Sequence, residues 1–488
     1  MPKKYKHPNI LVIITDQQRA DTMACYGNEW IQTPNINALA NESFVFQNAY
    51  VAQPVCTPSR STMLTGTYPH TNGLVRNGVA LRPEALSIAE LVPPDYRRVH
   101  YGKWHLGNDA KPQHGFADWI STGQIDPGPD GQHKSDYHTW LEHKGVKLPE
   151  HYVRPGGDGA GSKRAVAQAN LSEDFTQARF VGDITTKFLR EESDKPFVLF
   201  TNFFEPHPPY SGPLSGMYDP VTLPVGPEFL RYPESHSLFN RSRSEFYLKG
   251  DHREDSVAGC DQHDLHGEAG WRALRANYMA NVTLVDRQIG RIMEALEESG
   301  HSDDTIVVFT SDHGDMLGDH GLLEKRAFYD ASARVPLLIK VPWITESQTM
   351  IPGSIGHIDL VPTLLDLIGQ PIPEHLQGES KVPILLGEKT LENNDVFIQW
   401  NGRGDRDLGS EVINEMISLP RRTIVSGDRW KLNLCEGDNA ELFDLTSDPH
   451  EITNLFDDPQ QMERVRSMSG RLKAWQQKTG DIEPLPMI

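Results

Sequence analysis

The sequence predicts an α/β fold, with a large mainly parallel or mixed sheet flanked by helices and a small antiparallel subdomain with a helix after it. Three observations predict it. Continuous apolar runs recur along the first 340 residues, helical patterns lie between them, and short strand-like segments separated by turn residues follow residue 400. We therefore expect a large α/β domain over residues 1–400 and an antiparallel subdomain over residues 401–488.

The buried strands are expected where apolar runs are unbroken. These runs are Asn9–Thr15, Phe197–Thr201, Thr305–Thr310 and Val335–Ile339. A strand that is covered on both faces shows such a run instead of alternation, so each is predicted to be a parallel strand inside the sheet.

Helical periodicity separates these strands. The predicted helices are 172–192, with Ser172 as its cap, 267–299, with an apolar stripe from Leu274 to Leu296, and a third from His357 to Gly369. After residue 400 the pattern predicts strands at 423–425, 430–434 and 441–445 and a final helix at 459–478. Two stretches rich in Gly, Asp, His and Pro, 125–163 and 207–264, are expected to be long loops over one face.

Composition excludes several classes of protein. The chain has 488 residues, of which 38% are hydrophobic and 23% charged, and no apolar run approaches a membrane span. The formal net charge of -20 argues against binding nucleic acid or an anionic membrane, and an anionic substrate would need a local basic pocket. No hydrophobic signal precedes the first strand, so we expect a cytoplasmic location, or a periplasmic or secreted one if a signal was removed.

The four cysteines, Cys25, Cys56, Cys260 and Cys435, are far apart and show no paired spacing. A disulfide framework is not expected at this density. If chemistry consumes Cys56, the three that remain suit a reducing compartment.

Two predicted strands end in side chains of the kind that bind metals. Asp16 and Gln17 follow the first strand, and Asp312 and His313 follow the strand at 305–310. Ligands of open α/β sheets bind outside the carboxyl ends of the strands, and carboxylate and amide oxygens suit a hard divalent cation. A single strand-terminal Asp would more often cap the next helix, but two such ends in one chain favour a metal site.

The third chemical element is the segment 54–66, PVCTPSRSTMLTG. Pro58 stands where a helix can begin, which places Cys56 just before a helix amino terminus, where an anion is favoured. Arg60, one turn further, can hold an oxyanion with two hydrogen bonds. Taken alone, a cysteine is more often a small buried hydrophobic residue.

Cys-x-Pro-Ser-Arg followed by Thr-Gly resembles the signature of the type I, formylglycine-dependent sulfatases of the alkaline phosphatase-like superfamily. The resemblance extends along most of the chain, through segments that are similar to further family motifs: 102–107, 206–210, 311–314, 321–325 with 334–336, and 441–445 with 448–449 and 454–455. It implies that residues 1–400 are the catalytic sulfatase domain. It also implies a hydrolase of sulfate esters.

The resemblance implies a mechanism. A separate formylglycine-generating enzyme would oxidise Cys56 to an aldehyde, whose hydrate has two hydroxyls. One hydroxyl, held on the metal, attacks sulfur, the alcohol leaves, and the second hydroxyl loses its proton and expels sulfate. The implied metal ligands are Asp16, Gln17, Asp312 and His313, together with the residue made from Cys56.

Catalytic roles follow from the same resemblance. Arg60 would orient the diol and neutralise charge, and Lys103 and Lys325 would bind sulfate oxygens. His207 would protonate the leaving oxygen, and His105 would take the proton of the second hydroxyl. Arg326, beside Lys325, could serve in place of that lysine.

Gln17 and His313 depart from the commonest pattern. Most relatives have Asp at the first position and many have Asn at the second, whereas this pair resembles phosphonate monoester and phosphodiester hydrolases of the same superfamily. The substitution removes one negative charge from the metal site. We expect one Ca²⁺, with Mn²⁺ or Mg²⁺ as alternatives, since imidazole suits transition metals. The Thr57-Pro58-Ser59 context of the cysteine favours the sulfatases.

A carbohydrate sulfatase is the leading interpretation, because the long polar loops suit a sugar. Four loop residues could line a sugar pocket or could equally pack the loops: Arg76, His133, His138 and Trp140. A phosphonate monoester or phosphodiester hydrolase is the alternative enzyme. A non-catalytic protein that binds sulfated glycans would keep Cys56 as a thiol, and the complete set of proton-transfer residues argues against it. The sequence leaves the oligomeric state open.

Overall fold

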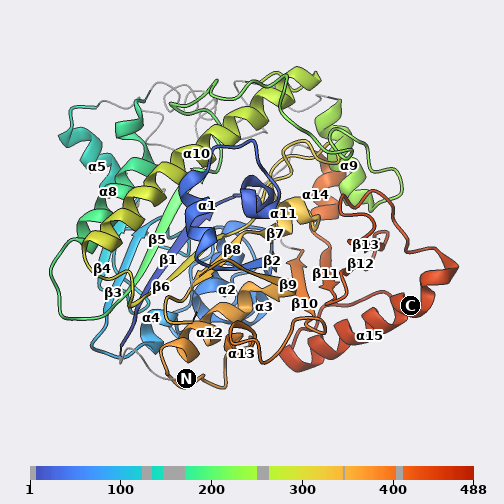
Figure 1. Ribbon diagram of the computed structural model, residues 1–488. Helices are drawn as coiled ribbons and strands as arrows, with labels where there is room; N and C mark the ends of the chain where they lie inside the picture. The colour runs from blue at the N-terminus through green and yellow to red at the C-terminus, as the bar shows by residue number, and fades with distance from the viewer. Residues whose placement is uncertain (1–6, 124–134, 147–170, 250–262, 345–346, 403–409) are drawn as a thin grey trace.

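The computed structural model describes residues 7–123, 135–146, 171–249, 263–344, 347–402 and 410–488 (Figure 1). A nine-stranded sheet forms the centre of the larger part. Eight of its strands follow the order β4-β3-β5-β1-β6-β8-β2-β7, and the ninth, β9, pairs with β2 outside this order. Its strands are β1 (Asn9–Asp16), β2 (Phe44–Tyr50), β3 (Arg97–Gly102), β4 (Asp118–Ser121), β5 (Phe197–Pro206), β6 (Thr305–Ser311), β7 (Arg334–Val335), β8 (Leu337–Lys340) and β9 (Thr349–Gly356).

The sheet is mixed. β1 pairs in parallel with β5 and β6, and β3 continues the parallel set, whereas β8 runs antiparallel to β6 and β2. The predicted fold class is therefore confirmed. The expectation of one parallel strand over Val335–Ile339 was wrong, because the run divides at Pro336 into β7 and β8, both antiparallel to β2. Proline has no N–H for a strand ladder, which explains the break.

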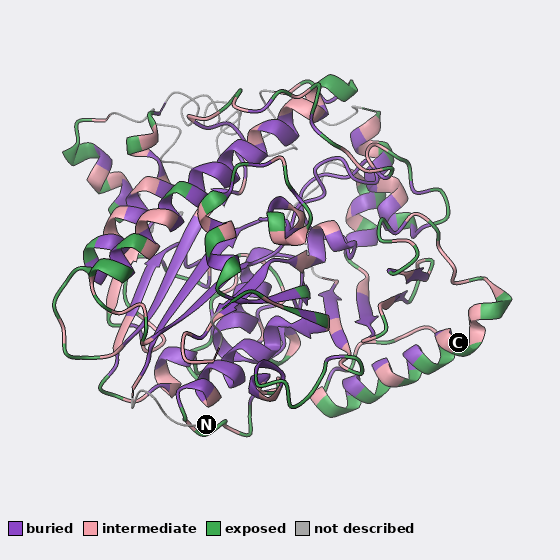
Figure 2. Cartoon of the chain, viewed as in Figure 1, coloured by how far each residue is buried: buried purple, intermediate pink, exposed green. Residues whose placement is uncertain are grey.

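Helices cover both faces of the sheet, and β1 contributes to both cores. Ile10, Val12 and Ile14 face a core that includes residues of α2, α4 and α12, whereas Leu11 and Ile13 face one that includes residues of α1, α8 and α10. Burial on both sides explains the unbroken apolar runs, and the strands in Figure 2 are almost wholly buried. The helix bounds are α1 (Pro34–Asn41), α2 (Cys56–Thr65), α4 (Ile88–Leu91), α8 (Gln177–Leu189), α10 (Glu268–Glu298) and α12 (Leu360–Leu367).

Two of the three predicted helices need correction at their starts. α10 forms over the expected residues, but the helix predicted from Ser172 is a short 3-10 turn, η3 (Glu173–Phe175), followed by α8. The cap is Thr176, whose hydroxyl accepts the Arg179 N–H, and Ser172 makes no such bond. The segment after His357 likewise begins as η4 (His357–Asp359) before α12.

The carboxy-terminal part holds an antiparallel sheet in the order β10-β11-β12-β13. Its strands are β10 (Val396–Asn401), β11 (Pro420–Val425), β12 (Trp430–Cys435) and β13 (Glu441–Asp444), and α15 (Met462–Thr479) packs on it through Val465, Met468 and Leu472. The predicted strands and final helix are present. The expected boundary after residue 400 falls inside β10.

The two stretches expected to be loops contain helices. α9 (Leu238–Leu248) lies in the second stretch, and α5 (Asp136–His143) lies in the first, of which 125–134 and 147–163 fall outside the described residues. The face that α9 buries includes Asn240, Arg243 and Ser244, so polar residues conceal its periodicity. The shorter helices are η1 (Ala20–Thr22), η2 (Ala24–Tyr26), α3 (Pro69–Asn72), α11 (Asp330–Ala333), α13 (Val382–Leu385), α14 (Glu411–Ile417) and η5 (Pro459–Gln461). Within the described part, no helix has the length and apolarity to span a membrane.

Candidate active site

The carboxyl ends of β1 and β6 bring the predicted metal ligands together. Thr15 is in register with Ser311, and the Asp312 N–H donates to the Thr15 carbonyl at 3.1 Å. Gln17 turns the chain with a φ of 70°, and its N–H donates to Asp312 Oδ1 at 3.0 Å. Asp16, Gln17, Asp312 and His313 are all fully buried. Their proximity follows from the strand pairing.

Cys56 is the first residue of α2, two residues before the helix start expected at Pro58. All ten residues of this helix are buried, and Gly66 ends it with a φ of 62°. The Thr57 N–H donates to Asn77 Oδ1 at 3.0 Å, so the amino-terminal turn is capped from a separate loop. The cysteine sulfur therefore stands at the positive end of a rigid helix.

Four predicted residues lie within 4 Å of the Cys56 sulfur. Lys325 Nζ is 3.2 Å away, His313 Nε2 is 3.3 Å away, and Asp16 Oδ1 and Lys103 Nζ are each 3.9 Å away. The structure thus brings both lysines and two of the metal ligands to one atom.

The two predicted proton-transfer residues, His105 and His207, belong to the same site, because both imidazoles interact with the Cys56 thiol and affect the pKa values there. His207 Nδ1 lies 2.8 Å from the Pro208 carbonyl, which can only accept, so this nitrogen carries a hydrogen. His105 has a φ of 60°, and its carbonyl accepts the Thr57 hydroxyl at 2.7 Å.

Arg60 lies behind the nucleophile and joins the two acidic ligands. Its Nε donates to Asp312 at 2.8 Å, and another guanidinium nitrogen donates to Asp16 at 3.1 Å. A third donates to the Lys103 carbonyl at 3.0 Å and to Asn202 Oδ1 at 3.1 Å. The guanidinium neutralises the carboxylate pair and fixes the backbone that carries Lys103.

Gly102 allows this arrangement of backbone. It has a φ of 96°, and a Cβ there would lie 1.8 Å from the Asn202 carbonyl oxygen. The next residue, Lys103, donates its N–H to that oxygen at 3.1 Å, and its ammonium group pairs with Asp16. Only glycine permits this close approach of β3 to β5.

The donor set fits a divalent cation. Ligand atoms of Asp16, Cys56, Asp312 and His313 all lie within 4.8 Å of one another, a possible metal-binding group. His313 Nδ1 donates to the Gly314 carbonyl at 2.8 Å, so Nε2 presents its lone pair to the group. Two buried carboxylates, an imidazole and the nearby Gln17 amide oxygen are suitable ligands for Ca²⁺ or Mn²⁺.

The electrostatics favour an anion at Cys56. Burial alone would raise the pKa of the thiol, but the ammonium groups of Lys103 and Lys325 bring it well below its usual value. Burial lowers the pKa of His207 to about 4, with Lys325 and Lys103 contributing in the same direction. A buried site that stabilises a thiolate can equally stabilise the charge of a bound sulfate.

Lys325, and not Arg326, faces the nucleophile, since Arg326 pairs with Glu324 at 3.2 Å. Sequence reasoning missed three other buried residues at the site: Asn202, which holds Arg60, and Asp315 and Tyr210, which contact Gln17. The available signal for Asn202 was its position as a polar residue directly after the apolar run Phe197–Thr201.

Two of the expected sugar-pocket residues lie on α5. The Trp140 ring packs against Phe180 at 5.2 Å and against Tyr137 at 6.1 Å, so it joins α5 to α8. His138 Nδ1 is 2.6 Å from the Ser135 hydroxyl. Arg76 is exposed in the loop that carries Asn77, and His133 lies outside the described residues.

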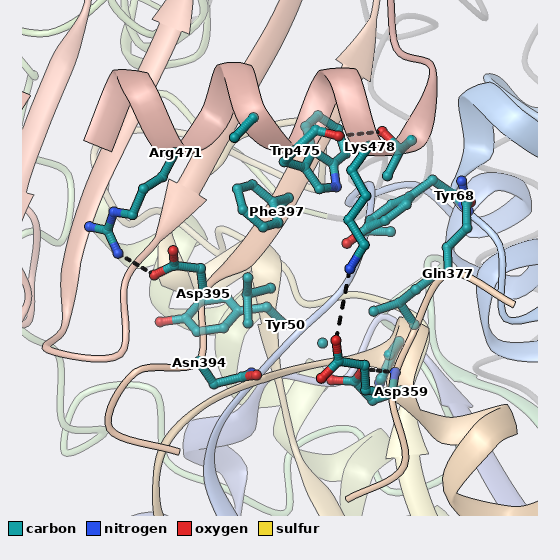
Figure 3. A pocket seen from close by; sticks show the side chains of 18 of the residues that line it. Tyr50, Tyr68, Asp359, Gln377, Asn394, Asp395, Phe397, Arg471, Trp475 and Lys478 are labelled. Atoms are coloured by element: carbon teal, nitrogen blue, oxygen red, sulfur yellow. Dashed lines mark hydrogen bonds and ion pairs between the residues drawn. The ribbon is translucent and has the colours of Figure 1, made fainter. Parts of the chain in front are cut away.

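A separate cavity of 380 Å³ lies between α15 and the segment 377–397 (Figure 3). Trp475 and Phe397 stack at 5.0 Å beside it. Its charged groups form ion pairs with one another: Arg471 with Asp395, Lys381 with Asp359 and Lys478 with Glu379. No residue predicted for catalysis lines this cavity, and two of the pairs, those of Arg471 and Lys478, join α15 to the segment 377–397.

The sequence matches two family models and is similar to named sulfatases. The family model described as Sulfatase matches residues 8–370, and that of the N-sulphoglucosamine sulphohydrolase carboxy-terminal region matches residues 318–478. The chain is 30% identical to YidJ of Escherichia coli, an uncharacterized sulfatase, over 93% of this chain and 84% of that protein. It is 27% identical to an N-acetylglucosamine-6-O-sulfatase of Bacteroides thetaiotaomicron, over 98% and 88%.

Among solved structures, the phosphonate monoester hydrolase from Silicibacter pomeroyi superposes with a TM-score of 0.78 at 26% identity. The match covers 97% of this chain and 96% of that one. The overall fold is therefore common to both types of hydrolase.

Proposed function

Because the chain belongs to the sulfatase family, we propose that it removes sulfate from carbohydrates, using a formylglycine made from Cys56 and a divalent cation held at the ends of β1 and β6. Membership makes it a sulfuric ester hydrolase, which argues against a protein that only binds glycans. One observation carries the proposal. Cys56 begins a buried helix, and two lysines, two proton-transfer imidazoles and the possible metal ligands converge on its sulfur.

The sulfur atom marks where the oxygens of hydrated formylglycine would lie. One hydroxyl oxygen forms a bond to the sulfur of the sulfate ester as the ester S–O bond breaks, and the alcohol leaves with a proton. The second hydroxyl then loses its proton, the bond between formylglycine carbon and sulfate oxygen breaks, and the aldehyde returns. A formylglycine-generating enzyme is therefore a required partner.

Each neighbour of Cys56 has a definite task in this proposal. Lys103 and Lys325 neutralise the sulfate oxygens as charge develops. His207 gives a proton to the leaving oxygen from Nε2, since Nδ1 is engaged by Pro208; this step uses the imidazolium form, which the negative charge of a bound sulfate favours. His105 receives the proton of the second hydroxyl.

A bound cation supplies positive charge that withdraws electron density from the sulfate group. Asp16, Gln17, Asp312 and His313 would hold it. Arg60 forms ion pairs with both Asp16 and Asp312, so the two carboxylates can stay adjacent.

The carbohydrate substrate is supported by the relative that is named an N-acetylglucosamine-6-O-sulfatase. The net charge of -20 favours a short or terminal sulfated sugar over a long polyanion. The test is kcat/KM on N-acetylglucosamine 6-sulfate and on an aryl sulfate. The proposal predicts a higher value for the sugar, and a higher value for the aryl ester would contradict the choice of carbohydrate.

A second candidate is a phosphonate monoester or phosphodiester hydrolase. Gln17 and His313 favour it, and so does the structural likeness to the Silicibacter pomeroyi enzyme. A sulfate ester and a phosphate ester that share the same leaving group distinguish the two activities. We expect kcat/KM to be higher for the sulfate, and the reverse order would favour the phosphate enzyme.

A further inference from the structure

The side chain of Gln17 is held at both of its amide atoms. Its Nε2 donates to Asp315 Oδ2 at 2.5 Å, and its Oε1 accepts from Lys325 Nζ at 2.9 Å. Its main chain is equally constrained, because its N–H donates to Asp312 and its carbonyl accepts the Tyr278 hydroxyl at 2.8 Å. Gln17 is fully buried, so the amide has one orientation.

Asp315 determines that orientation. Besides the Gln17 amide, its carboxylate accepts the Tyr210 hydroxyl at 2.7 Å and the Leu317 N–H at 3.0 Å. A carboxylate that receives three hydrogen bonds offers only acceptors, so the amide nitrogen must face it. The amide oxygen then faces Lys325 and the Cys56 side of the site.

We propose that Asp315, supported by Tyr210, is a positioning residue that makes Gln17 a neutral oxygen ligand for the cation. The inference rests on the metal site of the proposed function. A carboxylate at position 17 would face the Asp315 carboxylate without the amide hydrogen that now joins the two side chains, and two adjacent charged carboxylates are strongly unfavourable in a buried site. Asp315 therefore selects an amide here and limits the negative charge around the cation to Asp16 and Asp312.

The donor and acceptor pattern can be exchanged, and this provides the test. Gln17→Glu removes the donor that Asp315 requires, whereas Gln17→Glu combined with Asp315→Asn restores the hydrogen bond with its direction reversed. Calorimetric titration of chelator-treated full-length protein with CaCl₂, and separately with MnCl₂, measures cation affinity without substrate.

We expect Asp315→Asn to weaken Ca²⁺ binding by about 10- to 100-fold, the usual effect of removing a residue that orients a metal ligand. Gln17→Glu should also bind weakly, and the double variant should recover to within about threefold of the wild type. Tyr210→Phe removes one of three hydrogen-bond donors to Asp315 and should weaken Ca²⁺ binding by about 3- to 10-fold.

Asp286→Asn is the matched control. Asp286 is a buried carboxylate that accepts from Asn35 and Ile36 at the start of α1, and its loss should leave Ca²⁺ affinity unchanged. If Asp315→Asn does not fold, Tyr210→Phe and the comparison of single with double variant still decide the question.

Wild-type affinity in folded Asp315→Asn, or a double variant no tighter than Gln17→Glu, would overturn the inference while leaving the proposed function intact. A wild-type protein that binds neither cation would overturn both.

Discussion

The ammonium group of Lys325 lies 3.2 Å from the sulfur of Cys56. The adjacent Arg326 instead pairs with Glu324, so two neighbouring cations have different surroundings. Position in the fold, and not charge, distinguishes them.

Lys325→Met should lower kcat on a sulfate ester by about 10²- to 10³-fold, because it removes one donor aimed at developing charge. Arg326→Gln should lower it by less than about tenfold, since this residue does not face the nucleophile. Steady-state kinetics on both purified variants measure the difference. Equal losses would show that Lys325 has no direct role.

Removing the cation should destabilise the protein. Asp16 and Asp312 remain neutralised in part by Arg60, so the fold should persist, but bound cation at a hundred times its Kd contributes about 2.7 kcal/mol. Thermal unfolding should therefore shift to lower temperature with a chelator and recover on adding Ca²⁺. Asp312→Asn should abolish this response, and a chelator response that persists in this variant would place the cation elsewhere.

Gly102→Ala should disrupt the site more than a comparable substitution elsewhere. Gly102 and Gly78 both have positive φ, but a Cβ at Gly78 meets nothing within 4 Å, whereas at Gly102 it meets the Asn202 carbonyl oxygen. Backbone strain alone costs about 1–3 kcal/mol in each, and Gly102→Ala should cost more and displace Lys103. The free energy of unfolding in urea and kcat are measured for both variants. Equal losses of stability would argue against the close contact between residue 102 and the Asn202 carbonyl.

Acid should destabilise the protein through His357. Burial lowers the pKa of this imidazole to about 3, whereas the pKa of a histidine in the unfolded chain is about 6.5. The unfolded state therefore binds the proton first, and stability that is complete above pH 6.5 declines as pH falls toward 3. At pH 5 the loss is about 2 kcal/mol.

His357→Gln should remove that part of the pH dependence, measured as the change in unfolding free energy between pH 7 and pH 5 in urea. His143→Gln, at an exposed position on α5, is the control and should leave it unchanged. A full pH dependence in His357→Gln would contradict the assignment.

The central strands could be predicted because the apolar residues of each one are consecutive in the sequence. A strand buried on both faces must be apolar throughout, which located β1, β5 and β6. Pro336 was visible inside the fourth run, yet its consequence for strand direction depends on the pairing with β2, whose Tyr50 pairs with Arg334 from far earlier in the chain.

The site was predictable where its residues follow strands or stand in the Cys56 segment. The residues that orient them were not, because their partners come together only in the fold. Asn202 holds Arg60 across 142 residues, and Tyr210 reaches Asp315 across 105. Asp315 was visible beside His313, but its task depends on Gln17, nearly 300 residues away in the chain.

The proposed mechanism requires that Cys56 becomes formylglycine, and the mass of the peptide that contains residue 56 decides whether it does. The full chain would be produced in a host that has a formylglycine-generating enzyme, and the peptide carrying Cys56 would be analysed by mass spectrometry. We expect a mass about 18 Da below that of the cysteine peptide, whereas oxidation of a thiol adds mass. A peptide found only with the unmodified thiol mass would show that Cys56 does not become formylglycine and would overturn the proposed mechanism.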